Sequence, residues 1–568
     1  MKNSTVQLTV DSGLCTGCAM CEIVCPQKCI SVQEISGGLL EAVVDVCRCS
    51  QCESCLKVCG GIALCDEAIP KDMDPFIGTA LEAFLVKAND HHLRKNGQSG
   101  GAVIAMASYL LQKNEINGVL STFMPKDGSL RPYSQIVRNA ENIIDSQGSK
   151  YVPIPWARAF EKLDSKVDRI ATIGISCQYR SLFNSQMTLR KSWKSAIVLK
   201  IGLVCEGVLS FAVYDYLLST HNIPRECCQE YRFKSKIPNG WPGDGRAIAF
   251  DGSEFFIPNH ARTSCKDAFR PYYCRLCFDK MNILSDVICM DPWGINHDKE
   301  GYTVVVARTK RGLAAIQSVI DAEVLTAEKL DWDTVLKCQN VEERRKNWTT
   351  ATQIAKRRKK VLSKYPIDTK WYAKSPGYGA QRLLDIFLNR GSFHRKAKDR
   401  NSVVDTVLTF KKKLRIINKQ IAFWNKWSPL SLLKRVWRKV TKIRALVSGA
   451  ATEWCESISV SNAVPNFKSD FNPNPVPTPA VPTNLNVNNG TATASTLDIT
   501  WNAVSNAISY KLEVQLGETW ITIYMGSDTN FTHIALASNT SYSYRISAVN
   551  AVGTSAVSSM VSGKTKNK

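Results

Sequence analysis

Eight cysteines near the start of the chain have a spacing that suits iron–sulfur chemistry. They form two runs of the pattern Cys-x-x-Cys-x-x-Cys-x-x-x-Cys, made by Cys15, Cys18, Cys21 and Cys25, and by Cys49, Cys52, Cys55 and Cys59. Three thiolates at this spacing bind one cubane cluster, and the fourth thiolate of each run binds the other cluster. The sequence therefore predicts two 4Fe-4S clusters, one held by Cys15, Cys18, Cys21 and Cys59 and one held by Cys49, Cys52, Cys55 and Cys25.

A pair of zinc sites is the alternative, but zinc usually takes two separate Cys-x-x-Cys pairs. This segment resembles bacterial two-cluster ferredoxins, which implies an α+β ferredoxin-like cluster domain over residues 1–70. Gly60 stands where the second proline of that pattern usually lies, and we expect it to loosen the turn without removing a ligand. We interpret Cys29, Cys47 and Cys65 as packing residues, because free cysteines are often buried.

A glycine-rich loop precedes a helix-like apolar run, Ala102–Leu111. The loop consists of Gly97, Gln98, Ser99, Gly100 and Gly101. Glycines before a helix let backbone N–H groups approach an anion, and the helix dipole favours a phosphate there. An ordinary glycine turn is the alternative.

Four later cysteines form a further candidate metal site. Cys177 and Cys205 each follow an apolar β-like run, and Cys274 and Cys277 form a Cys-x-x-Cys pair. In a parallel sheet, the first two would lie at the same carboxyl edge, where ligands bind. We therefore predict a third 4Fe-4S cluster on these four thiolates. The alternative is two core cysteines and a pair that binds no metal; Cys227, Cys228, Cys265 and Cys289 are interpreted as structural.

Together with Gly148-Ser149-Lys150-Tyr151 and Asp291-Pro292-Trp293-Gly294, these motifs resemble the beta-subunit family of coenzyme F420-reducing hydrogenases and dehydrogenases over residues 8–330. The resemblance implies FAD beside 4Fe-4S clusters, with hydride exchanged on one side and single electrons on the other. We expect FAD at the glycine loop and at Ser149, Lys150 and Tyr151. Lys150 is expected beside the flavin or an anionic substrate; a solvated surface lysine is the alternative.

Apolar β-like runs alternate with helix-like stretches between residues 76 and 335, which predicts an α/β flavin domain. The expected strands are Gly118–Phe123, Arg169–Ile175, Ala196–Val204 and Tyr302–Ala307.

The net charge of +23 comes from one segment. Residues 337–444 contain 30 Lys and Arg against 6 Asp and Glu. We expect a basic helical segment over 336–463 and a Pro/Asn-rich linker over 464–480. Within the basic segment, residues 428–447 have apolar side chains at helical spacing flanked by cations, which suits an anionic membrane surface. A helix packed on its own domain is the alternative, and the absence of a base-reading motif argues against nucleic acid.

Residues 481–568 resemble a fibronectin type III domain, an all-β sandwich. The matching residues are Pro482, Leu485, Trp501, Tyr510, Leu536, Tyr542, Asn550, Gly553 and Ser555. Trp501 is expected in the core, and Leu536 and Tyr542 fit a tyrosine corner. This module is expected to bind a protein or glycan, or to act as a spacer.

The predicted protein is a multidomain, FAD-dependent iron–sulfur oxidoreductase with a redox partner protein or a deazaflavin-type substrate, such as coenzyme F420. Two alternatives remain open, a non-catalytic electron-transfer subunit and a fibronectin-domain adaptor. Because no long apolar segment is present, we expect a cytoplasmic location with peripheral membrane contact through the basic segment.

Overall fold

The computed structural model describes residues 5–295, 298–373 and 478–567, except 508, 517–518, 527, 535 and 551–553. The chain divides into two compact units, Met1–Ser448 and Gly449–Lys568. The basic helix predicted over 428–447 and nearly all of the predicted linker lie outside the described residues. The boundaries predicted within the first unit stay predictions.

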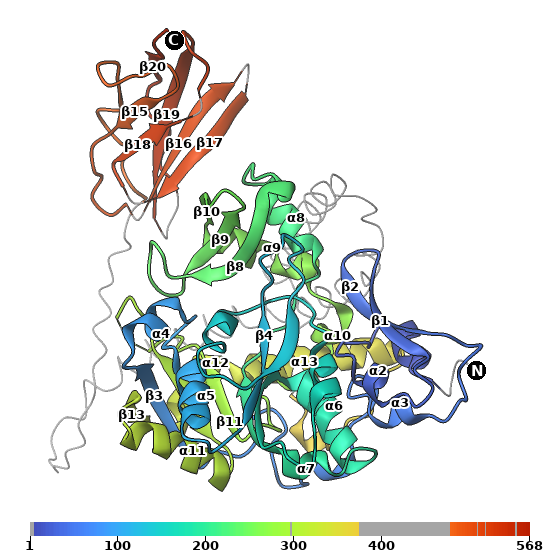
Figure 1. Cartoon of the computed structure of the whole chain (residues 1–568). Coiled ribbons are helices and arrows are strands. Elements are labelled where there is room, and N and C mark those ends of the chain that lie inside the picture. Colours follow the sequence, from blue (N-terminus) through green and yellow to red (C-terminus); the bar gives the residue numbers. More distant parts are fainter. Residues whose placement is uncertain are drawn as a thin grey trace, which may run out of the picture. The chain divides into compact units, whose positions relative to one another are not determined.

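The first unit is built on an eight-stranded mixed sheet (Figure 1). Its strands, in spatial order, are β13 (Leu325–Leu330), β3 (Glu82–Ala88), β12 (Thr303–Ala307), β11 (Val287–Met290), β7 (Ile197–Leu203), β6 (Ile170–Ile175), β4 (Gly118–Phe123) and β5 (Tyr133–Val137). The four neighbours β11, β7, β6 and β4 run parallel, whereas every other pair is antiparallel. The α/β organisation is thus confirmed, and the four expected strands agree with β4, β6, β7 and β12 to within one residue at each end.

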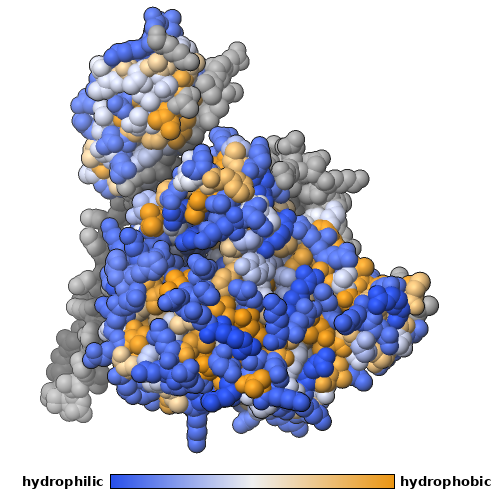
Figure 2. All heavy atoms as spheres, in the orientation of Figure 1, coloured by the Kyte–Doolittle hydropathy of each residue, from blue (hydrophilic) through white to orange (hydrophobic). Residues whose placement is uncertain are grey.

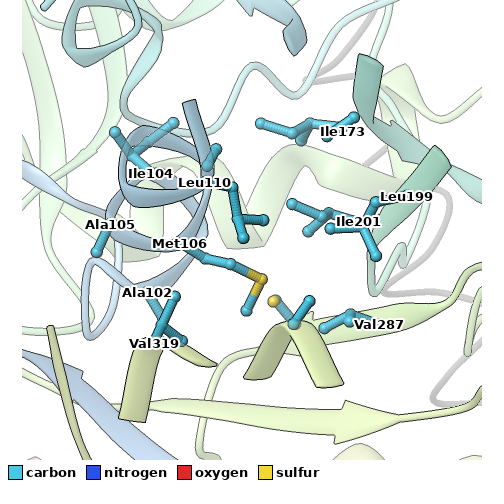
Figure 3. Close-up of a cluster of buried hydrophobic side chains, with 14 of the residues drawn as sticks. Ala102, Ile104, Ala105, Met106, Leu110, Ile173, Leu199, Ile201, Val287 and Val319 are labelled. Atoms are coloured by element: carbon cyan, nitrogen blue, oxygen red, sulfur yellow. The ribbon is translucent and has the colours of Figure 1, made fainter. Parts of the chain in front are cut away.

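Helices cover both faces of this sheet because its central strands are apolar on both sides. The helices on the two faces are α4 (His91–Asn96), α5 (Ala102–Gln112), α6 (Ser176–Met187), α7 (Trp193–Ala196) and α11 (Lys310–Asp321). Figure 3 shows Met106 and Leu110 of α5 pointing toward Leu199, Ile201 and Val287 of the sheet. On the opposite face, α6 buries Tyr179 and Leu182 in a separate apolar cluster that includes Ile170 and Ile197.

Three smaller parts complete the described portion of this unit. The cysteine-rich start contains α1 (Gln7–Asp11), α2 (Met20–Val24), α3 (Ser54–Lys57) and the hairpin β1 (Ile30–Ile35) and β2 (Leu39–Val44). A three-stranded sheet, β8 (Cys228–Ser235), β9 (Asp244–Ala249) and β10 (Glu254–Ile257), packs with α8 (Ala212–Ser219) and α9 (Asn259–Phe269), and α10 (Tyr272–Arg275) follows α9. After β13 come α12 (Trp332–Gln339) and α13 (Val341–Arg357).

The second unit is a sandwich of two antiparallel sheets. One sheet contains β14 (Asn486–Asn488), β15 (Leu497–Thr500) and β18 (Asn530–His533); the other contains β17 (Thr519–Gly526), β16 (Ser509–Leu516), β19 (Ser541–Val549) and β20 (Val561–Lys564). Trp501 is buried in the core between them, as expected. The Tyr542 hydroxyl accepts a hydrogen bond from Ala537 N–H (2.9 Å), so the tyrosine ties its strand to the preceding loop.

The face of the molecule drawn in Figure 2 mixes hydrophilic and apolar residues. Within the described ranges, none of the helices has the length and apolarity that a membrane span needs.

Candidate active site

A cavity of about 710 Å³ opens at one edge of the eight-stranded sheet. Strands β4, β6, β7 and β11 are parallel, and β3 has the same direction, because both β3 and β11 are antiparallel to β12. The segments that follow these strands therefore meet at one edge, where α/β folds bind ligands. A cavity of this volume can bury a cofactor-sized molecule.

The glycine loop contributes four of its five predicted residues to the cavity lining, namely Gly97, Gln98, Ser99 and Gly101. It leads into α5, whose first residues, Ala102 to Ile104, also line the cavity, and no side chain caps this helix. Unsatisfied N–H groups in a first helical turn favour a phosphate. The structure thus presents the N-terminus of α5 to the cavity.

Gly100 packs against the strands beside the loop. Its N–H donates to Thr303 Oγ1 (2.8 Å), and a Cβ at this position would lie 2.6 Å from Val86 O. Gly100 therefore lets the loop pack against β3 and β12, and unlike its neighbours it does not line the cavity.

Ser149, Lys150 and Tyr151 line the cavity together with the glycine loop. Gln98 Nε2 donates to the Tyr151 hydroxyl (3.1 Å), so the structure brings the two predicted segments into contact. Lys150 Nζ donates to Ser146 O (2.6 Å) and Gln147 O (3.1 Å). Burial, with a smaller contribution from Arg232, lowers the pKa of Lys150 to about 7.

An ion pair that was not predicted from the sequence lies beside these segments. Lys234 Nζ on β8 is 2.8 Å from Asp291 Oδ2, which also accepts from Gln98 Nε2 (3.2 Å). The ammonium lies 5.2 Å from the ring centroid of Trp293. Burial acts against the charge of Lys234, but Tyr151 and Asp291 raise its pKa. No sequence motif pointed to Lys234.

A cationic helix face forms another part of the lining. Arg262 and Lys266 of α9 and Arg270, which follows it, are four residues apart and all line the cavity. The Nε atoms of Arg262 and Arg270 are buried and lack a hydrogen-bond partner among the described residues. Buried polar atoms are normally paired, so this wall suits an anionic ligand. Helical spacing in the sequence could have revealed these three cations.

The four later cysteines all line the same cavity. Cys177 is the second residue of α6, and Cys205 follows β7; the paired strand ends Ile175 and Leu203 place both at one edge, as expected. Cys274 lies in the single turn of α10, and Cys277 follows it.

Burial, with the charge of Cys277, raises the pKa of Cys205 to about 11, and burial, with the charge of Cys205, raises that of Cys274 to about 12. Grouped buried thiols become thiolates readily only when a metal supplies positive charge, so this donor set fits an iron–sulfur cluster. Throughout residues 5–295, 298–373 and 478–567, no three His, Cys, Asp or Glu side chains could hold a single metal ion. A cubane requires a wider arrangement, because each thiolate binds a different iron.

The two N-terminal cysteine sets differ in exposure. Burial, with the charges of Cys59 and Cys18, raises the pKa of Cys15 to about 12, so these thiols are neighbours. In the second set, Cys52 is exposed. Cys29 is buried, as expected, and its Sγ lies 3.5 Å from Cys25 Sγ.

The interpretation of Cys47 as a packing residue is wrong, because this thiol is exposed. It follows β2 in a turn where its N–H donates to Asp45 Oδ1 (3.0 Å), which holds the backbone and leaves the side chain in solvent. Cys65 is half-buried.

The first cysteine set touches α6 directly. Ser181 Oγ lies 3.4 Å from Cys18 Sγ and accepts from Gly60 N–H (3.1 Å). Arg180 Nε donates to Gly60 O (3.3 Å), and its Nη1 lies 3.5 Å from Cys277 Sγ. A Cβ on Gly60 would lie 2.7 Å from Ser181 N, so Gly60 permits close packing on α6 rather than loosening a turn. The sequence did not predict that Arg180 and Ser181 would contact the cysteine-rich module.

Two stretches of the chain match models of one family. Residues 83–161 match the N-terminal model of the coenzyme F420 hydrogenase/dehydrogenase beta subunit, and residues 167–332 match its C-terminal model. The chain is 26% identical over 356 residues to the coenzyme F420-dependent sulfite reductase of Methanocaldococcus jannaschii, covering 60% of this chain and 52% of that protein. It therefore spans about half the length of that relative.

Two further similarities are to components of larger complexes. One subunit of the F420H2 dehydrogenase of Methanosarcina mazei is 27% identical over 34% of this chain and 54% of its own length. A chain in the F420-reducing [NiFe] hydrogenase complex from Methanosarcina barkeri is 18% identical with a TM-score of 0.40, covering 50% of this chain and 95% of its own.

Proposed function

We propose that this chain is an iron–sulfur flavoprotein oxidoreductase that exchanges electrons with a hydride-donating or hydride-accepting substrate. The observation that carries this proposal is that one cavity joins the N-terminus of α5, a cationic helix face and four cysteines. When bound, FAD accepts or gives a hydride and exchanges single electrons with 4Fe-4S clusters. The residues present suit each of these groups.

Different residues of the protein would bind FAD, hold the cluster and carry a proton. The first turn of α5, reached through Gly101, would hold the pyrophosphate of FAD, because its N–H groups are uncapped. Cys177, Cys205, Cys274 and Cys277 would hold the third cluster. Lys150, with a pKa of about 7, can carry or release a proton at Nζ near neutral pH, and its two backbone acceptors hold that atom in place.

The hydride substrate is proposed to be a polyanion, for which coenzyme F420 is the leading candidate. The sulfite reductase of M. jannaschii is F420-dependent by name. In this chain, Arg262, Lys266 and Arg270 are spaced over about 12 Å at the helical rise of 1.5 Å per residue, which suits several anionic groups along one ligand. The ion pair of Lys234 and Asp291 would orient its polar end.

An electron-transfer subunit within a larger assembly is the second candidate. The relative in M. mazei is a dehydrogenase subunit. The exposed thiol Cys52 of the second N-terminal set supports electron exchange with a redox partner protein at that surface. For the second structural unit, the Tyr542 bond and the buried Trp501 support a fibronectin type III-like binding or spacer module.

Anaerobic purification followed by assays of flavin, iron and zinc tests the proposal. We expect stoichiometric FAD, iron in all three sites, and bleaching of the flavin and cluster absorbance on addition of reduced F420. Zinc in place of iron, or protein that binds no added FAD, would contradict it. Bound FAD without oxidation of reduced F420 or nicotinamide donors would favour the electron-transfer subunit.

A further inference from the structure

The third cysteine set consists of Cys177, Cys205, Cys274 and Cys277. Helix α13 begins nine residues after the stretch matched by the family models, yet it contacts loops of this set. Figure 1 shows α13 beside α10, which carries Cys274, and the two helices are in contact. Two α13 side chains reach the loops of the predicted ligands. Trp348 Nε1 donates to Leu276 O (3.0 Å), and Arg344 donates to the loops of both Cys205 and Cys277.

Arg344 bridges two ligand loops that come from different parts of the chain. Its Nη1 donates to Cys277 O (3.3 Å), and its Nη2 donates to Cys205 O (3.4 Å) and Glu206 O (3.2 Å). The same Nη2 is 3.2 Å from Glu206 Oε2. Outside these contacts, Cys205 N–H donates to Lys280 O (3.1 Å). Because the planar guanidinium carries five donors in a fixed fork, arginine suits this bridge better than lysine.

The charge of Arg344 is also buried beside the thiols, since only 10% of its side chain is exposed. A second cation is also near these thiols, since Arg180 Nη1 lies 3.5 Å from Cys277 Sγ. Reduction adds one negative charge to a cluster, so a nearby buried cation favours the reduced form and raises the reduction potential. Arg180 also binds the N-terminal cysteine module through Gly60 O, whereas every Arg344 bond named above is to the Cys205 and Cys277 loops.

We propose that Arg344 is a positioning residue that holds the Cys205 and Cys277 loops together and raises the reduction potential of the cluster bound there. This inference rests on the proposed function, because it requires a cluster on Cys177, Cys205, Cys274 and Cys277. Lowering that potential would weaken this cluster as an acceptor of electrons from the neighbouring cavity.

The test uses the full chain purified anaerobically, with the variants Arg344→Met, Arg344→Gln and Arg344→Lys. Iron content and a redox titration followed by electron paramagnetic resonance are measured. The matched control is Arg357→Met, which removes an exposed cation from the last turn of the same helix. Wild-type protein should bind about twelve irons, four for each cysteine set.

The Met and Gln variants should lower one of three midpoint potentials, with the Lys variant and the control staying near the wild type. Loss of about four irons in the Met, Gln and Lys variants but not in the control would equally support the bridging role, because lysine keeps the charge but not the fork of donors. If Arg344→Met does not fold, the midpoint potentials of Arg344→Gln and Arg344→Lys are compared instead, because only lysine keeps the charge. Unchanged iron and unchanged potentials in the neutral variants would overturn the inference. A wild-type content of about eight irons would instead reject the third cluster of the proposed function.

Discussion

Ser181 Oγ of α6 lies 3.4 Å from Cys18 Sγ, and the same hydroxyl accepts from Gly60 N–H. Cys177 precedes Ser181 by four residues on that helix, which is about one turn. One short helix thus contacts the first N-terminal cysteine set and carries a residue of the third set. Electron transfer between the two sets would have a direct protein route here.

Removing the Ser181 hydroxyl should therefore slow electron transfer between the cavity and the N-terminal module. Ser181→Ala leaves Gly60 N–H without its acceptor, which should also cost about 1 kcal/mol in unfolding free energy. Rapid-mixing spectroscopy would follow cluster reduction after flavin reduction. Ser185→Ala is the matched control, because Ser185 Oγ donates within α6, to Ser181 O (2.7 Å). Equal rates in both variants would contradict the route.

Serine replacement of Cys177, Cys205, Cys274 and Cys277 should lower iron content by about four atoms per chain and leave about eight from the N-terminal sets. The reason is that these thiols line one cavity and become thiolates readily only with a metal. Colorimetric iron assays on anaerobic protein measure this. Cys289→Ser is the control, since Cys289 lines the cavity but lies within β11. Unchanged iron in the fourfold variant would exclude the third cluster.

Val103→Asp should release FAD while the protein stays folded. Val103 is in the first turn of α5 and lines the cavity, so a carboxylate there would repel phosphate but interact well with the helix dipole. Flavin released by denaturation is quantified by fluorescence, and we expect at least a tenfold loss. Val103→Asn, of similar size and neutral, should retain most of the flavin. Gly100→Ala would not test this site, because the added Cβ would clash with Val86 O.

Lys150 should react with acylating reagents at a pH well below that of exposed lysines. Burial lowers its folded pKa to about 7, whereas an unperturbed lysine titrates near about 10.4. Mass spectrometry of flavin-free protein labelled briefly between pH 6 and 10 should give a labelling midpoint near pH 7 for Lys150. The unfolded chain binds more protons than the folded chain between these two values. The contribution of Lys150 to stability therefore rises as the pH increases through that window. A midpoint above pH 9 would contradict the burial effect.

Tyr542→Phe should loosen the second unit without affecting the first. The variant leaves Ala537 N–H without its partner, which should cost about 1 kcal/mol. Hydrogen exchange measured by mass spectrometry should become faster in peptides of β19. Peptides of β6 and β7 in the same sample are the internal control and should exchange at wild-type rates. No change in β19 would show that the tyrosine bond does not stabilise this sandwich.

The sequence by itself determined the features that depend on local spacing. The two Cys-x-x-Cys-x-x-Cys-x-x-x-Cys runs, the apolar strands β4, β6 and β7, and the helix after the glycine loop were readable because each depends on neighbours a few residues apart. The shared edge for Cys177 and Cys205 was also predictable, since parallel strands place their following residues together.

Only the tertiary structure decided what approaches these elements from distant parts of the chain. It placed Lys234 of β8 against Asp291, Arg344 of α13 across the Cys205 and Cys277 loops, and Ser181 beside Cys18. It also showed that Gly60 packs closely on α6 rather than loosening a turn, and that Gly100 packs closely on β3 and β12. Apart from the packing of Gly100 on β3, these contacts join residues separated by more than fifty positions. No local period encodes them, because they arise only when the packed layers bring those backbones together.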